Sequence, residues 1–297
     1  MENMNMTKEQ ILEKLKADLE ARGFSKSTIR KYTSAVRVFQ EHFDLAADRM
    51  REPEIMQFQR YLLNEKGLQP VSVNDYNGAF RFLYGATLDM PLNYLKIPKV
   101  KFNRRIPQLF TRDEIAKIID SEKCLDKKAM FMLAYGSGLR LSEITNLKVA
   151  HIESGKMRIL VHKGKGGRDR YALLPQSTLA VLRSYWIERR PDDWLFVAPR
   201  KGGKYSTKTL AEAFKAALMR SGVPTTGSLH ILRHCFATHL YEDGHNLLTM
   251  KKLLGHAKIT TTAWYTQIAD TMMTGLTSPL DNLTFEKGPL REEVCDA

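Results

Sequence analysis

Apolar residues recur at helical spacing over the first 90 residues of the chain. Four stretches between residues 7 and 90 carry apolar side chains three or four positions apart, beginning with the run from Ile11 to Leu19. Such a stripe is typical of amphipathic helices. Gly23 follows the first stretch and Pro70 precedes the last, where helices commonly end and begin. The pattern predicts a small bundle of four helices.

A different pattern begins after residue 107. The sequence Thr-Arg-Asp-Glu from Thr111 matches a capping box, and an apolar run before Gly136 predicts a buried helix followed by a break and another helix. Short runs at residues 156–161 and 170–174 then flank a glycine-rich stretch, which predicts a β-hairpin. We expect further helices at about residues 175–190, 207–221, 228–242, 246–254 and 259–265.

These patterns predict a mainly α (α+β) fold, with a helical N-terminal bundle and a mainly helical second domain that holds a small antiparallel β-sheet. Between them, residues 96–107 contain five basic residues, no acidic ones and a proline near each end. This composition predicts a linker able to lie along a phosphate backbone, although a merely solvated linker is the alternative. We therefore expect domains at residues 1–95 and 108–279, joined by this linker, and a weakly ordered C-terminal tail at residues 280–297.

The net charge of the chain indicates which class of partner it binds. The 297-residue chain has a net charge of +13 and a sequence pI of about 9.6. Residues 1–105 hold 18 basic and 13 acidic residues, and the remainder holds 28 and 20. Because both parts are cationic, we expect both to contact a polyanion such as nucleic acid. A solvated lysine-rich surface is the alternative.

Composition also indicates the compartment. The chain has no uninterrupted apolar stretch of the ~18–20 residues needed to cross a membrane, and its N-terminus lacks a readable secretory signal. We expect a soluble, cytoplasmic protein. Cys124, Cys235 and Cys295 are odd in number and include no C-x-x-C pair, so free thiols are expected rather than disulfides or a zinc site.

Candidate chemistry is concentrated in the second domain. The sequences I-L-R-H-C-F-A-T-H-L from Ile231, L-L-G-H ending at His256 and T-T-A-W-Y-T around Tyr265 bring arginine, histidine and tyrosine together along a run of short helices. A tyrosine can attack a phosphate while neighbouring cations stabilise charge and histidines move protons, without a metal. The series predicts phosphodiester chemistry.

Two further motifs, G-S-G-L-R-L-S-E around Arg140 and K-G-K-G-G-R-D-R around Lys165, complete a set that resembles the tyrosine recombinases of the phage integrase family. The resemblance extends from about Thr111 to Ile268, and the N-terminal bundle with its basic linker is similar to the family's core-binding domain. It implies a C-shaped clamp around duplex DNA and DNA strand exchange. The implied catalytic residues are Arg140, Lys165, His230, Arg233, His256 and Tyr265.

The chemistry of these residues fits that resemblance. A phenol with a pKa of ~10 is a poor nucleophile at neutral pH, so Tyr265 needs cations nearby. Arg140 and Arg233 can hold the non-bridging oxygens of a scissile phosphate through their planar guanidinium groups. Arg140 also follows a glycine break at an expected helix start, where backbone amides favour phosphate. Glu143, one turn later, is expected to orient Arg140, with a solvated ion pair as the alternative.

Other roles come from the resemblance. It makes Lys165 the general acid, and its choice over Lys163 depends on the family's register. It has His230 assist proton transfer at the tyrosine, while His256 hydrogen-bonds the phosphate. His234 lies one turn from His230, but the intervening Ile-Leu-Arg lacks a zincin glutamate and includes a cation, so no metal is expected. No cofactor is expected either.

The leading hypothesis is a site-specific DNA recombinase that works through a 3′-phosphotyrosyl intermediate and a Holliday junction. Its expected partners are double-stranded DNA with a specific core site and three further protomers, in a homotetramer or a heterotetramer with a related recombinase. The helix after Tyr265, roughly residues 269–276, is expected to bind a neighbouring protomer. The biological setting is either integration and excision of a mobile element or resolution of chromosome dimers. A type IB topoisomerase-like enzyme and a catalytically inactive DNA-binding protein are the alternatives.

Overall fold

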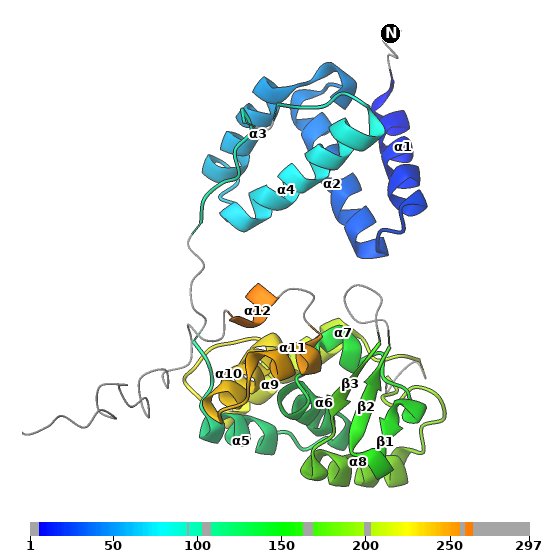
Figure 1. The fold of residues 1–297 in the computed structure, drawn as a ribbon, viewed down its shortest axis with the longest axis vertical. Coiled ribbons are helices and arrows are strands. Elements are labelled where there is room, and N and C mark those ends of the chain that lie inside the picture. Colours follow the sequence, from blue (N-terminus) through cyan, green and yellow to red (C-terminus); the bar gives the residue numbers. More distant parts are fainter. Residues whose placement is uncertain are drawn as a thin grey trace, which may run out of the picture. The chain divides into compact units, whose positions relative to one another are not determined.

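The chain divides into two units, Met1–Arg105 and Ile106–Ala297, which are considered separately. Figure 1 shows the elements of each unit in a computed structural model. The structure describes residues 6–93, 95–102, 108–162, 169–198, 203–255 and 259–263. No helix in this described part is long and apolar enough to span a lipid bilayer.

The described part of the first unit consists of helices joined by short loops. Thr7 caps the first helix in a capping box with Gln10, and the side chain of Ser25 caps the second. Pro53 and Pro70 lie in the first turns of the next two α-helices, where a missing N–H costs nothing. The elements are α1 (Lys8–Ala21), α2 (Lys26–Phe43), η1 (Ala47–Arg49), α3 (Glu52–Asn64), α4 (Pro70–Phe82) and η2 (Leu83–Thr87).

Aromatic rings form the centre of this unit. Phe39 of α2 lies with its ring centroid 5.2 Å from that of Phe58 of α3 and 4.7 Å from that of Phe80 of α4. All three side chains are fully or almost fully buried, together with Ile11 and Leu19 from the stripe of α1. The predicted four-helix bundle is therefore confirmed, and its core joins the apolar faces of all four helices.

The second unit combines helices with a small sheet. Its first helix begins with the expected capping box between Thr111 and Glu114. The described elements are α5 (Arg112–Asp120), α6 (Leu125–Gly136), α7 (Leu141–Ile144), η3 (Val149–His151), β1 (Ile152–Glu153), η4 (Ser154–Lys156), β2 (Arg158–Val161), β3 (Arg170–Leu173), α8 (Gln176–Arg189), α9 (Thr207–Ser221), α10 (Leu229–Glu242), α11 (Leu247–Leu254) and α12 (Ile259–Ala263).

The sheet is antiparallel in the order β1-β2-β3. The β2–β3 pair confirms the predicted hairpin strands, and its register runs from Arg158 opposite Leu173 to Val161 opposite Arg170. The sequence did not predict β1, which is only two residues long and pairs Ile152 with Ile159. The mainly α (α+β) fold is thus confirmed, with three strands in the described part of the chain instead of two.

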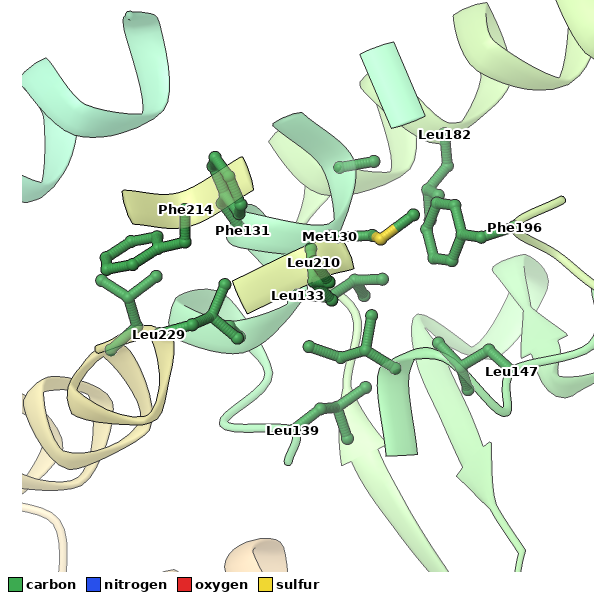
Figure 2. Packing of buried hydrophobic residues seen from close by; sticks show 14 of the residues in the cluster. Met130, Phe131, Leu133, Leu139, Leu147, Leu182, Phe196, Leu210, Phe214 and Leu229 are labelled. Atoms are coloured by element: carbon green, nitrogen blue, oxygen red, sulfur yellow. The ribbon is translucent and has the colours of Figure 1, made fainter. Parts of the chain in front are cut away.

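Helix α6 occupies the middle of the second core. Its buried Met130, Phe131 and Leu133 lie among side chains from other helices and loops (Figure 2). Phe131 makes an edge-to-face contact with Phe214 of α9 at 5.3 Å between centroids. Because α6 ends at Gly136, this core fixes the place where the Gly-Ser-Gly break and Arg140 follow.

Candidate active site

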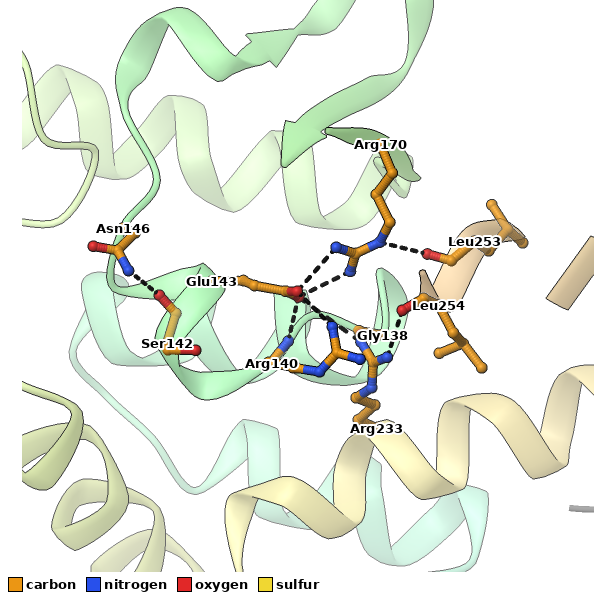
Figure 3. A network of polar contacts seen from close by, with 9 residues as sticks. All are labelled: Gly138, Arg140, Ser142, Glu143, Asn146, Arg170, Arg233, Leu253 and Leu254. Carbon is orange, nitrogen blue, oxygen red and sulfur yellow. Dashed lines mark hydrogen bonds and ion pairs between the residues drawn. The ribbon is translucent and has the colours of Figure 1, made fainter. Parts of the chain in front are cut away.

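One carboxylate, that of Glu143 in α7, lies at the centre of the described site. Its Oε1 accepts hydrogen bonds from Nη1 of Arg140 at 2.7 Å and from Nη1 of Arg170 at 2.9 Å. Its Oε2 accepts from the backbone N–H of Arg140 and from Nη2 of Arg170, both at 2.8 Å. Figure 3 shows these arginines converging on Glu143. The side chain of Glu143 is only 6% exposed, so its pair with Arg140 is not a solvated one.

A third arginine, Arg233 of α10, completes the cluster. Its Nη1 lies 3.8 Å from Oε2 of Glu143 and donates a hydrogen bond to the carbonyl oxygen of Gly138. Its Nη2 donates to the carbonyl oxygen of Leu254 at 2.6 Å, and the side chain is almost completely buried. Arg233 therefore joins the loop before Arg140 to the end of α11, two segments that are far apart in the sequence.

Glu143 remains ionised in this environment. Burial by itself raises the pKa of the carboxyl group, but the hydrogen bonds and charge of Arg170, followed by those of Arg140, outweigh burial and lower the pKa to about 2. At neutral pH the carboxylate is therefore charged. It can hold both guanidinium groups through charge-assisted hydrogen bonds.

The cluster carries more positive than negative charge. Among the described residues, three guanidinium groups surround the carboxylate of Glu143, a formal excess of two positive charges. Buried charge is costly unless it is compensated, so an anion bound beside these arginines would be strongly favoured. Arg140 is the most exposed of the three at 21%, against 10% for Arg170 and 2% for Arg233. Arg140 is therefore the group best placed to meet an incoming phosphate.

Arg140 lies at the start of a helix, as the sequence predicted. The helix is a single turn, and Arg140 is its N-cap residue. The backbone N–H of Arg140 donates to Glu143, so this amide serves the carboxylate of its own chain and not a bound phosphate. Of the groups of Arg140 itself, the guanidinium is therefore the one that can meet an incoming anion.

Two glycines allow close packing at the site, one against Phe236 and the other against Arg170. Gly138 has a φ of +61°, and an added Cβ would lie 2.4 Å from Cδ1 of Phe236. Gly255 has a φ of +63°, and an added Cβ would lie 2.6 Å from Cδ of Arg170. Both positions require glycine for conformation and for space. These are the glycines of the G-S-G-L-R and L-L-G-H motifs, so each motif contains a packing requirement beside its chemical residue.

His230 lies in the first turn of α10, three residues before Arg233. Its ring meets that of His234 edge to face, with 4.9 Å between the centroids. Although the residue is exposed overall, partial desolvation of the ring, followed by the positive charges of Arg233 and Arg140, lowers the pKa of His230 below its ordinary value of 6.5. The imidazole is therefore mainly neutral at pH 7 and can accept a proton.

Three of the predicted site residues, Lys165, His256 and Tyr265, lie outside the described residues. Their roles stay predictions. The described neighbours are the β2 and β3 residues on either side of the segment that contains Lys165, and Gly255 directly before His256. The structure brings Arg140, Glu143 and Arg233 together, and His230 shares the helix α10 with Arg233.

Arg170 is the site residue that the sequence analysis missed. It belongs to the R-D-R sequence after the glycine-rich stretch, but its contacts with Glu143 and Leu253 join residues 27 and 83 positions apart. One local signal was available. Along β3, the half-buried Arg170 and the buried Ala172 lie on one face, and the exposed Tyr171 between them lies on the other. An arginine therefore occupies the inward face of the strand.

A metal site or a reactive thiol would depend on the other described cysteine, histidine and acidic side chains. Among the described residues, no group of three or more histidine, cysteine, aspartate or glutamate side chains is arranged to hold a metal ion. Cys124 and Cys235 are free thiols. Burial raises the pKa of Cys235 to about 11, which makes it unreactive at neutral pH. Cys295 lies outside the described residues.

Two family models match the chain. Residues 108–272 match the phage integrase family, and residues 11–94 match the phage integrase N-terminal SAM-like domain. A putative integrase/recombinase, y4qK of Sinorhizobium fredii, is 35% identical over 276 residues, covering 91% of this chain and 88% of that protein. The tyrosine recombinase XerA of Pyrococcus furiosus is 34% identical over 268 residues, covering 87% and 90%. A crystal structure of a lambda integrase tetramer bound to a Holliday junction matches with a TM-score of 0.71 and 19% identity, covering 88% of this chain and 78% of that one.

Proposed function

The chain belongs to the phage integrase family of tyrosine recombinases, and from this premise we propose that it is a site-specific DNA recombinase that cuts and rejoins DNA through a 3′-phosphotyrosyl intermediate. The observation that carries the proposal is the arginine cluster around Glu143. Its excess positive charge and the partial exposure of Arg140 suit a scissile phosphate.

Each proposed catalytic residue has a distinct task. Tyr265 is the nucleophile, Arg140 and Arg233 hold the non-bridging oxygens of the phosphate, and Lys165 is the general acid. His230 accepts the phenolic proton, a role that its lowered pKa supports because the ring is neutral at pH 7. His256 hydrogen-bonds the phosphate, and Glu143 positions Arg140 through the contacts described above.

The reaction balances without a cofactor. The phenolic oxygen of Tyr265 forms a bond to phosphorus, the bond between phosphorus and the 5′ oxygen breaks, and Lys165 gives a proton to the leaving oxygen. The aryl phosphate ester keeps the bond energy. The 5′ hydroxyl of a partner strand then attacks the same phosphorus, tyrosine leaves, and the strands are exchanged. Two such rounds on opposite strands form and resolve a Holliday junction.

The proposed partner is duplex DNA with a specific core site, bound by four protomers. The protomers are either four copies of this chain or copies of this chain with a related recombinase. The similarity to the fold of a lambda integrase tetramer bound to a Holliday junction supports such an assembly. The net charge of +13, shared by both parts of the chain, supports contacts with phosphates from each.

Covalent trapping tests this proposal. The purified chain is incubated in EDTA with nicked DNA fragments from its native locus, denatured with SDS and compared with Tyr265→Phe. The nick allows the small cleaved fragment to diffuse away, so a slow adduct accumulates. We expect a denaturation-resistant adduct with the wild type alone. Adducts with both proteins would show that the nucleophile is not Tyr265, and tight binding without adduct would favour an inactive binder or a missing partner chain.

The same material separates the alternatives. A type IB topoisomerase-like enzyme would relax supercoiled DNA at many sequences as a monomer, whereas a recombinase transfers strands between two copies of one site. The sequence of the trapped ends also distinguishes the two biological settings. Ends at the borders of a mobile element indicate integration and excision, while ends at one chromosomal site indicate chromosome-dimer resolution.

A further inference from the structure

Arg170 occupies a position between two parts of the active site. Its two terminal nitrogens each donate to a different oxygen of Glu143, at 2.9 and 2.8 Å, which is the forked geometry available to a guanidinium. Its Nε donates to the carbonyl oxygen of Leu253 at 3.0 Å. One side chain therefore holds the carboxylate that contacts Arg140 and the last turn of α11, directly before Gly255 and His256.

The contact with α11 is close as well as polar. Gly255 leaves room for Arg170 because a Cβ there would lie 2.6 Å from Cδ and 2.9 Å from Nε of the arginine. Arg233 donates to the next carbonyl, that of Leu254, so two arginines hold successive carbonyl groups at the end of one helix. Both arginines also face Glu143.

We propose that Arg170 is a positioning residue for strand cleavage, which sets the orientation of Arg140 through Glu143 and fixes the end of α11 through Leu253. The inference rests on the proposed function. Arg170 does not contact the phosphate in this role. Without it, Glu143 loses two of its four short hydrogen bonds and can rotate, so Arg140 no longer has a single orientation.

Lysine cannot replace this arginine. A single ammonium group could approach Glu143, but it cannot donate in parallel to both carboxylate oxygens while a third donor reaches Leu253. If Arg170 acted only as a counter-charge to Glu143, lysine would restore the cleavage rate. If Arg170 is a positioning residue, lysine would not restore it. Arg170→Lys therefore separates the two roles, and Arg170→Gln removes charge and fork together.

The experiment measures single-turnover adduct formation at saturating DNA for the wild type, Arg170→Gln, Arg170→Lys and the control Arg158→Gln. Arg158 is an arginine of the neighbouring strand β2 that pairs with Glu153 outside the cluster. We expect both Arg170 variants to cleave roughly 10- to 100-fold more slowly with DNA affinity changed less than about 2-fold, and Arg158→Gln to cleave at the wild-type rate.

A second substrate distinguishes positioning from folding. A neutral methylphosphonate at the cleavage position lacks the charge that Arg140 neutralises, so a defect that acts through Arg140 shrinks on this substrate. Because each variant is compared with itself on two substrates, the ratio does not depend on the fraction of folded protein. On DNA with an ordinary phosphate, we expect Arg170→Gln to cleave about 10- to 100-fold more slowly than the wild type. On the neutral substrate, we expect the ratio of the two rates to be at least about 5-fold smaller.

The outcomes are distinct. An equal defect on both substrates, wild-type cleavage by Arg170→Gln, or full rescue by Arg170→Lys would overturn the positioning role. Absence of adduct with the wild-type chain would instead count against the proposed function, and the positioning role, which depends on it, would fall with it.

Discussion

At the scale of single residues, the organisation of the site depends on one buried carboxylate. Glu143 accepts from two arginines and lies near a third. Buried ion pairs contribute little net stability once desolvation is counted, so stability alone does not account for such a cluster. A role in geometry explains the cluster better. Four short hydrogen bonds fix the carboxylate of Glu143, and the fixed carboxylate holds the guanidinium group of Arg140 in one orientation.

Glu143→Gln should destabilise the chain in a pH-dependent manner. The folded-state pKa of about 2 lies below the ordinary value of 4.5, so the carboxylate stabilises the fold fully above pH 4.5 and loses this contribution as the pH falls toward 2. We expect the wild type to exceed Glu143→Gln by about 3 kcal/mol at pH 7, and by much less at pH 3. Urea unfolding of both proteins at the two pH values measures the difference.

A matched variant controls for the loss of a carboxylate elsewhere. Glu153 pairs with Arg158 at 2.7 Å on the surface of the sheet, where solvent screens the interaction. Glu153→Gln should therefore change the unfolding free energy far less than Glu143→Gln at pH 7. A difference between wild type and Glu143→Gln that stays constant from pH 7 to pH 3 would contradict the ionised, arginine-bound state.

At the scale of elements, local patterns predicted the long helices, the hairpin strands and the helix after the Gly-Ser-Gly break, but not strand β1 or the distant contacts that hold the site together. The capping box at Thr111 and the alternation in β2 and β3 are local signals, and both were readable. Strand β1 has two residues, too few to show a period. Glu143 was found because Arg140 is one turn away, whereas Arg170 was missed because its partners are distant in the chain.

Gly138→Ala should affect stability and cleavage through the break between α6 and α7. Gly222 provides the control, because it also has a positive φ, +67°, but has no atom within 4 Å of an added Cβ. At Gly138 the same Cβ would overlap the ring of Phe236, beside the carbonyl that accepts from Arg233. We expect Gly138→Ala to lose about 1–3 kcal/mol more than Gly222→Ala, measured by urea unfolding.

The two glycine variants should also differ in adduct formation. Gly138→Ala displaces the carbonyl group that holds Arg233, so cleavage should slow even at temperatures where the variant is folded. Gly222 ends α9, and its substitution should leave the rate of the folded protein unchanged. Equal stability losses at the two glycines would mean that the loop moves aside and that the close approach to Phe236 is not required.

At the scale of the whole molecule, positive charge occurs in both units. The first 105 residues have an excess of basic over acidic residues, and so does the rest of the chain. The proposed division into an N-terminal domain, a basic linker and a catalytic domain would give three cationic segments along one duplex. Their combined affinity would come mainly from counterion release, which is independent of DNA sequence and depends strongly on salt.

The salt dependence of DNA binding tests whether the linker takes part. For a chain that contacts 6–10 phosphates, the affinity for a duplex should fall by about 10³- to 10⁵-fold between 50 and 200 mM salt. Lys99 and Lys101 are exposed and belong to the proposed linker at residues 96–107. If they lie along the phosphate backbone, changing both to glutamine should reduce the slope of log affinity against log salt by about two.

Fluorescence anisotropy on a duplex without the core site measures this slope, with Tyr265→Phe as the background in every protein so that cleavage does not intervene. Removing two phosphate contacts releases fewer counterions, so the variant should lose more affinity at 50 mM salt than at 200 mM. A variant with the unchanged slope would show that the linker is only solvated. The positive charge that binds DNA would then lie outside residues 96–107.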